Sequence, residues 1–282
     1  MSASNHRVYT SYDLDSLPKH PGKPWTRFVC ISDTHSRTRL VVPPGDVLIH
    51  AGDLSSWGTL SNLQITLDWL RGLPHKVKII VAGNHDLCLD YKWAGNIGTG
   101  LDPKEVDAAQ DLVRSDAMRE AGILYLDHQS VEINLPDGIK WKFYGTPAAP
   151  LYASGAFQYA STEEAIEEWS QIPQDVDILV THTPPFGVLD KTRRGKLAGC
   201  RTLASRVNSL PNCRLHVFGH IHEAHGVNIA KRIVSEPNKE PHQIDFISVN
   251  AACYNSEMPI IVDIKKDALF CRETGAGRGS LR

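Results

Sequence analysis

Short apolar runs alternate with amphipathic segments along most of this chain. Several runs are rich in β-branched residues and are bounded by Gly, Pro or Asp, which is typical of buried strands. They predict strands at residues 27–32, 46–50, 76–81, 177–181, 214–218, 246–250 and 259–264. The alternation of these runs with helical segments indicates an α/β protein.

Three segments have the pattern of helices. Leu60, Leu63, Leu67 and Leu70 fall on one helical face, which predicts an amphipathic helix between the second and third strands. A helix is expected over residues 103–120, capped by Asp102. Another is expected over residues 162–169, because Ser161 or Thr162 precedes a run of glutamates.

The two ends of the chain differ from its middle. Residues 1–26 are polar and proline-dotted, and we expect a tail or a strap across the domain. Residues 271–282 have the composition of a flexible tail. Between them we find no repeat and no low-complexity linker, so residues 27–270 are expected to form a single domain.

Composition narrows the class of protein. The 282 residues are 41% hydrophobic and 22% charged, with a net charge of −2, so we expect no long nucleic acid as a partner. No apolar stretch approaches the roughly 20 residues that span a bilayer, so no membrane partner is expected. Scattered cysteines and a polar N-terminus favour a reduced, cytoplasmic setting. The oligomeric state stays open.

Polar stretches follow five of the predicted strands. They read Asp33-x-His35, Gly52-Asp53, Gly83-Asn84-His85-Asp86, Thr181-His182 and Gly219-His220-x-His222. Because ligands bind at the carboxyl ends of strands in α/β sheets, we expect these residues to converge. Carboxylate, amide and imidazole groups suit divalent ions, and a carboxylate from a tight turn suits the bridge between two ions.

Charge counting favours an anionic substrate for such a site. Two divalent ions carry four positive charges, which Asp33, Asp53 and a bridging hydroxide reduce to one. A phosphodiester can neutralise that remaining charge. The pattern therefore indicates hydrolysis of a phosphate ester by two metal ions.

This ordered set resembles the calcineurin-like metallophosphoesterase superfamily over about residues 27–264. The flanking text is most similar to its metallophosphoesterase-domain-containing branch, in the stretches FVCISDTHS, GDVLIHAGDL, IIVAGNHDL, THTPPFG, LHVFGHIHEAHG and SVNAACYN. The resemblance implies a two-sheet α/β/β/α sandwich with a binuclear metal site. Mn²⁺ is the first expectation for its ions, with Fe, Mg²⁺ or Zn²⁺ as alternatives.

The resemblance also implies a role for each residue of the motifs. The first ion would be held by Asp33, His35 and His222, the second by Asn84, His182 and His220, with Asp53 as the bridge. His85 would protonate the leaving alkoxide, and Asp86 would orient the His85 ring. Some members of the branch lack the histidine at the position of His220. Because His220 is present here, we expect a competent enzyme.

Residues outside the motifs are weaker candidates for contact with substrate. These candidates are His225, Asn250 and Arg194. The presence of each is explained equally well by packing or by a solvated loop. The long segments 90–120 and 146–160 carry aromatic residues, and whether they form a lid stays open.

The expected reaction is hydrolysis of a small, nucleotide-like phosphodiester such as a cyclic nucleotide. The first alternative is a phosphomonoesterase or protein phosphatase, whose Gly-Asp motif continues as Asp-Arg-Gly in the resembled relatives. This chain continues instead as Leu54-Ser55-Ser56, which lowers that alternative. The second alternative is a catalytically weak scaffold, which the intact ligand set disfavours.

Overall fold

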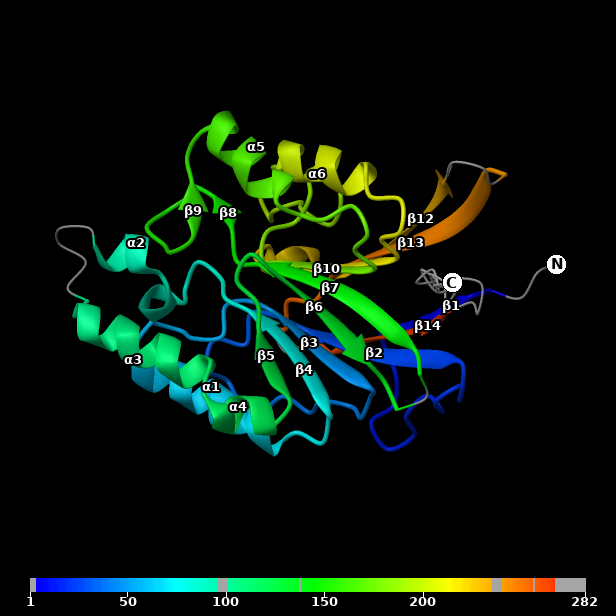
Figure 1. The fold of residues 1–282 in the computed structure, drawn as a ribbon, viewed down its shortest axis with the longest axis horizontal. Coiled ribbons are helices and arrows are strands. Elements are labelled where there is room, and N and C mark those ends of the chain that lie inside the picture. The colour runs from blue at the N-terminus through cyan, green and yellow to red at the C-terminus, as the bar shows by residue number, and fades with distance from the viewer. Residues whose placement is uncertain (1–3, 96–100, 137, 235–239, 256, 267–282) are drawn as a thin grey trace, which may run out of the picture.

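Two six-stranded sheets lie face to face, with helices on both outer sides (Figure 1). This arrangement is seen in a computed structural model, which describes residues 4–95, 101–136, 138–234, 240–255 and 257–266. The predicted α/β/β/α sandwich is confirmed. The flexible tail predicted for residues 271–282 lies outside the described residues.

The first sheet holds the strands of the N-terminal half. Its order is β1 (His6–Tyr9), β14 (Ile260–Lys265), β2 (Trp25–Ile31), β3 (Val47–Ala51), β4 (Val77–Val81) and β5 (Ile123–Tyr125). Strands β2 to β5 run parallel, whereas β14 and β1 are antiparallel to their neighbours. The segment 1–26, expected to be a tail or strap, thus contributes an edge strand through β1.

The second sheet is built from later strands and also contains four neighbouring parallel strands. Its order is β12 (Gly226–Val234), β13 (His242–Asn250), β11 (Leu215–Phe218), β10 (Ile178–Thr181), β7 (Lys140–Thr146) and β6 (Gln129–Asn134). The four central strands are parallel and the two edge strands are antiparallel. A small third sheet pairs β8 (Ala149–Pro150) with β9 (Gln158–Tyr159).

Helices cover the outer face of each sheet. Those against the first sheet are α1 (Leu60–Gly72), α3 (Pro103–Val113) and α4 (Asp116–Glu120); those against the second are α5 (Thr162–Ser170) and α6 (Arg201–Asn208) (Figure 1). The short elements are η1 (Leu87–Leu89), α2 (Tyr91–Ala94) and η2 (His222–Ala224). In α1 the predicted apolar face is buried, and Ser161 caps α5 through a capping box with Glu164.

The prediction of one helix over residues 103–120 is wrong at one point. The helix ends at Val113, and α4 begins after Ser115. The Ser115 side chain accepts a hydrogen bond from the Met118 backbone N–H, so it caps a new helix instead of continuing the old one.

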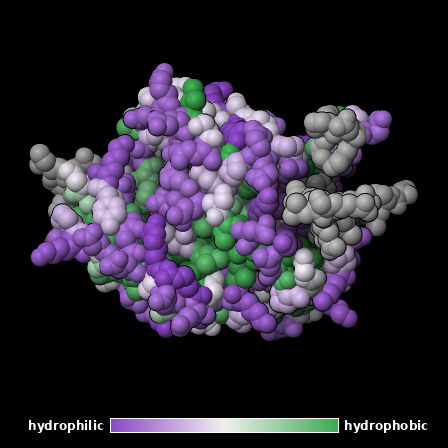
Figure 2. Space-filling view, in the orientation of Figure 1, coloured by the Kyte–Doolittle hydropathy of each residue, from purple (hydrophilic) through white to green (hydrophobic). Residues whose placement is uncertain are grey.

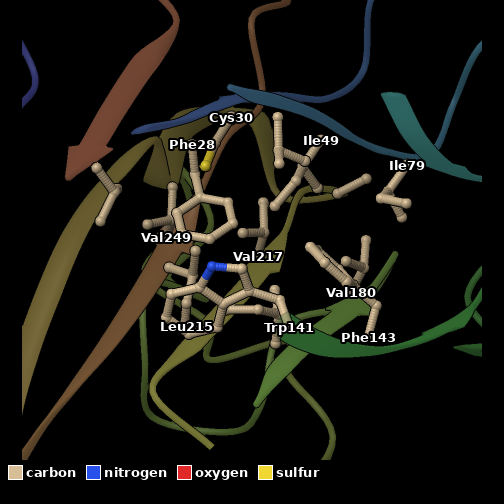
Figure 3. Close-up of a cluster of buried hydrophobic side chains, with 14 of the residues drawn as sticks. Phe28, Cys30, Ile49, Ile79, Trp141, Phe143, Val180, Leu215, Val217 and Val249 are labelled. Atoms are coloured by element: carbon tan, nitrogen blue, oxygen red, sulfur yellow. The ribbon is translucent and has the colours of Figure 1, made fainter. Parts of the chain in front are cut away.

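The main core lies between the two sheets. Phe28 of β2 packs edge-on against Trp141 of β7 with ring centroids 5.3 Å apart, and Phe143 adjoins them (Figure 3). The Trp141 indole N–H donates to Thr26 Oγ1 at 2.9 Å, which satisfies the one polar atom of this buried ring. Close packing of this kind fixes one sheet against the other and hence the loops at their ends.

Figure 2 shows a face that is mostly hydrophilic, with hydrophobic residues gathered near its middle. Within the described ranges, no helix combines the length and apolar character needed to cross a membrane.

Candidate metal centre

The predicted site residues occupy loops that leave the ends of parallel strands. Asp33 follows β2 and Asp53 follows β3, and both have a left-handed backbone, with φ of 55° and 53°. The loops hold one another, because Asp33 N–H donates to Gly52 O at 2.9 Å and His35 N–H donates to Asp53 O at 3.1 Å. Such conformations persist where surrounding bonds enforce them, and they are frequent at functional sites.

Asp33, His35, Asp53 and His222 form the first group of donors. One ligand atom from each lies within 4.8 Å of the others. His222 Nε2 is 3.1 Å from Asp33 Oδ1, and His35 Nε2 is 3.6 Å from Asp53 Oδ2. The structure therefore brings together the three residues expected for one ion and the expected bridging carboxylate.

Asn84, His182 and His220 form the second group, on the other side of Asp53. His182 Nε2 is 3.0 Å from Asn84 Oδ1 and 3.2 Å from His220 Nδ1. The same nitrogen is 3.4 Å from Asp53 Oδ1. The two carboxylate oxygens of Asp53 thus face different groups, as a ligand between two ions requires.

Two glycines allow the loops to approach this closely. A Cβ at Gly83 would lie 2.4 Å from Asp53 Oδ1 and 2.7 Å from His182 Cε1. A Cβ at Gly219 would lie 2.0 Å from Asp33 Oδ2, which belongs to the opposite sheet. Both glycines therefore leave space that a ligand residue occupies.

Hydrogen bonds present the ring nitrogen of His182 to the centre. Its Nδ1 lies 2.9 Å from the Ala51 carbonyl oxygen, so Nδ1 carries the proton and donates. The lone pair is then on Nε2, which points to Asp53 and Asn84. Metal-binding histidines are commonly fixed in this way by a bond from their other nitrogen.

The protonation states match a site for cations. Burial lowers the pKa of His35 to about 3 and that of His220 to about 3, which keeps both rings neutral. Burial tends to raise the pKa of Asp33, but the hydrogen bond from His222 and the neighbouring histidines bring it below its ordinary value. Burial and the nearby carboxylates Asp33 and Asp86 raise the pKa of Asp53.

Neither Asp33 nor Asp53 is paired with a lysine or an arginine among the described residues. Among the described residues, the ion pairs of Asp33 and Asp53 are with histidines alone. Burial tends to lower the pKa of His222, but its hydrogen bond and charge interaction with Asp33 raise it above its ordinary value. Two buried carboxylates with His35 and His220 held neutral beside them remain costly unless a cation joins them. The residues present therefore fit divalent metal ions, whose preferred ligands are these donor types.

His85 lies beside both groups, with its side chain exposed. Its backbone N–H donates to Asp53 Oδ1 at 2.9 Å, and its ring packs edge-on against His35. The ring Nδ1 is 3.1 Å from the Ser56 carbonyl oxygen. The imidazole is therefore oriented by a backbone carbonyl, with Nε2 left for a substrate.

The expectation that Asp86 orients the His85 ring is wrong. Asp86 is fully buried and accepts hydrogen bonds from the backbone N–H groups of Leu54, Ser55 and Gly83 and from the Ser55 hydroxyl. The bonds from Leu54 and Ser55 tie the loop after β4 to the loop after β3, and the bond from Gly83 closes the loop after β4 on itself. Asp86 therefore stabilises the loops that carry Asp53 and Asn84.

The candidates for substrate contact have different surroundings. Asn250 is fully buried, and its amide group bonds Leu189 O, Ile221 O and Ala252 N–H, so its expected place in the pocket is wrong. His225 is half-buried, with Nε2 3.1 Å from Met258 O. Arg194 is exposed on the loop before α6 and, within the described chain, forms no hydrogen bond or ion pair with either group.

Other contributors were missed by the sequence-based reasoning. Ala51 and Ser56 act through backbone carbonyls, which carry no signal in a sequence. Tyr254 stacks on His222 with ring centroids 4.3 Å apart and an interplanar angle of 21°. It belongs to the motif SVNAACYN, but its contact with a residue of another loop could be found only from the fold.

Comparison with known proteins bears on this geometry. The family model for calcineurin-like phosphoesterase matches residues 26–224, which include every ligand of both groups. The chain belongs to the calcineurin-like phosphoesterase family. Membership of this family makes the protein a metal-dependent phosphoesterase. Its buried cluster of Asp and His residues is suited to divalent ions.

Individual relatives of this phosphoesterase support the same assignment. The chain is 35% identical to metallophosphoesterase domain-containing protein 1 of Homo sapiens and of Mus musculus, over 88% of this chain and 73% of theirs. It is 38% identical to a probable rhamnogalacturonate lyase C of Emericella nidulans, over 72% of this chain but 18% of that protein. Because the match covers 18% of that protein, its name does not describe the region that it shares with this chain.

Proposed function

We propose that the protein is a two-metal phosphodiesterase that hydrolyses small, nucleotide-like diesters such as cyclic nucleotides. Mn²⁺ is its proposed metal, and the cytoplasm its proposed setting. The observation that carries the proposal is Asp53, whose oxygens face two separate groups of donors at 3.6 Å and 3.4 Å. This placement suits one ion on each side of a shared carboxylate.

The chemistry divides between the metals and His85. When bound, two divalent ions would supply a clamp for the ester phosphate and an activated water. As an imidazolium, His85 would keep its Nδ1–H bond to Ser56 O and give the proton on Nε2 to the leaving oxygen. The exposure of this side chain lets it reach a substrate at the mouth of the site.

The charge of the centre supports an anionic ester. Asp33 and Asp53 are its buried carboxylates, and the remaining ligand positions are imidazoles and an amide. A centre with more carboxylates would repel a phosphodiester. The neutral donors therefore keep the bound ions electrophilic.

A comparison of two substrates tests this proposal. The Mn²⁺-loaded protein should cleave bis(para-nitrophenyl) phosphate with a higher kcat/KM than para-nitrophenyl phosphate. A clear preference for the monoester would favour the phosphomonoesterase alternative. Failure to cleave either ester, with at most one ion bound per chain, would instead support the scaffold alternative.

A further inference from the structure

A stack of three side chains extends outward from the metal centre. The Tyr254 ring lies on the His222 imidazole at 4.3 Å and edge-on to His35 at 5.1 Å. The guanidinium carbon of Arg37 lies 4.0 Å from the centroid of the same ring. Two planar groups this close to the ring would overlap on a single face, so His222 and Arg37 cover opposite faces of Tyr254.

This stack excludes one role for Tyr254 and indicates another. With both faces covered, the ring has no open face on which a nucleobase could stack. It instead packs against the imidazole on the metal side and supports a cation on the outer side. Guanidinium groups are commonly held over aromatic rings in this manner.

Two hydrogen bonds fix the orientation of Arg37. Nη1 donates to the Tyr254 carbonyl oxygen, and Nε donates to Thr34 O at 3.3 Å. Nη2 donates to no acceptor among the described residues, and the side chain is exposed. Arg37 is therefore a held cation with donors left for an anion.

A cleft of about 290 Å³ adjoins this cation. Thr34, which stands between the ligands Asp33 and His35, is in its wall, as is Arg37. Its apolar lining includes Val41, which is 58% exposed, and Met258, whose carbonyl is bonded by His225. This volume is close to the lower limit of small-molecule sites, roughly 300 Å³.

The charge of the lining favours an anion. Arg37 and Arg39 both line the cleft, and Glu257 is the single acidic side chain in its wall. The Glu257 carboxylate also accepts the Asn255 backbone N–H at 2.6 Å, which satisfies part of its hydrogen-bonding capacity. The cleft thus combines apolar surface with a surplus of positive charge.

We propose that this cleft binds the non-reacting part of the substrate, and that Arg37, positioned by Tyr254, recognises a second anionic group there. The class of ligand is a small phosphodiester whose non-reacting half carries a further carboxylate or phosphate. The inference rests on the proposed function, because it takes the reacting phosphate to be at the metal centre.

Two product analogues that differ by one carboxylate test the inference. Inhibition of bis(para-nitrophenyl) phosphate hydrolysis is measured with phenyl phosphate and with para-carboxyphenyl phosphate in the Mn²⁺-loaded protein. The carboxylated analogue should bind more tightly by about tenfold or more, the worth of a hydrogen bond between charged groups. In Arg37→Gln this ratio should fall to about twofold or less.

Variants of Tyr254 and Arg7 serve as controls. Tyr254→Phe keeps the ring and should retain the preference, whereas Tyr254→Ala should lose it, with thermal unfolding as a check of folding. Arg7 of β1 lies 5.0 Å from the centroid of the Trp25 ring. Trp25 begins β2, at the opposite end of that strand from the metal centre. Arg7→Gln should leave the ratio unchanged.

Three outcomes would overturn the inference. Equal binding of the two analogues by the wild type would show that the cleft recognises no second anion. If Arg37→Gln keeps the preference for the carboxylated analogue, the carboxylate is recognised by another residue, or Arg37 contacts the reacting phosphate. Absence of diester hydrolysis by the wild type would overturn the proposed function as well, whereas hydrolysis without a carboxylate preference would overturn the inference alone.

Discussion

The two sheets contribute different chemistry to one centre. Loops of the first sheet carry both carboxylates, Asp33 and Asp53, together with Asn84 and His35, whereas loops of the second sheet carry imidazoles only. Each sheet contains four neighbouring parallel strands. The difference therefore arises from the loops and not from the architecture.

This difference shows how the centre depends on the packing of the sheets. The first sheet alone would bring two buried carboxylates together, which repel each other. His182 and His222 enter from the second sheet and lie between 3.1 Å and 3.4 Å from those carboxylates. A variant of Asp53, which contacts both groups, should therefore affect both, whereas a variant of a histidine from the second sheet should affect one.

Asp53→Asn should have the largest effect. The amide removes the negative charge shared by the two groups, so both ions should be lost and turnover should fall to background. Metal content per chain and the rate on bis(para-nitrophenyl) phosphate measure this. Asp68→Asn, on the exposed face of α1, is the matched control and should keep both. Full metal content in Asp53→Asn would contradict the bridging role.

His220→Ala should remove one ion and leave the other. Its Nδ1 belongs to the group of Asn84 and His182, so the group of Asp33, His35 and His222 stays intact. We expect about one Mn²⁺ per chain and no measurable turnover, because two-metal catalysis needs both ions. Loss of both ions on dialysis would show that the two groups are not separable.

His85→Ala should slow the reaction while sparing the metals. His85 touches Asp53 only through its backbone N–H, which alanine retains. The rate should fall by about 10²–10⁴-fold, the usual contribution of a general acid. Metal content is the control measurement, and a variant that binds fewer ions than the wild type would make His85 a ligand instead.

Gly83→Ala should give a smaller loss, and it tests the contact between the sheets. The added Cβ must displace Asp53 Oδ1 or His182 Cε1, from which it would lie 2.4 Å and 2.7 Å. Misplacement by about 1 Å costs on the order of 10²-fold in rate. Gly72→Ala, where the added atom meets nothing within 4 Å, should leave the rate unchanged. Equal rates in both variants would refute the close-packing argument.

The sequence predicted the parts of the fold with the strongest patterns. Buried β-branched runs located β2, β3, β4, β10 and β11, and each polar stretch after them lies at the centre. Strands β6 and β12 were missed because most of their residues are exposed or half-buried and give no apolar run. Helix α6 was missed because only Leu203 and Val207 are buried in it.

The site shows the same limit. The proposed ligands could be named from motifs because carboxylate, amide and imidazole side chains are themselves the groups that bind metal ions. The roles of Asp86, Asn250 and Tyr254 depended on partners from other loops, so their surroundings decided them. Backbone carbonyls such as that of Ser56 cannot be distinguished in a sequence at all.

Anomalous diffraction from crystals of the Mn²⁺-loaded protein would show directly how many ions the centre binds. We expect two peaks, one on each side of the Asp53 carboxylate, with His35 and His222 beside the first and His182 and His220 beside the second. A single peak within the group of Asp33, His35, Asp53 and His222, at full metal loading, would contradict a two-metal phosphoesterase.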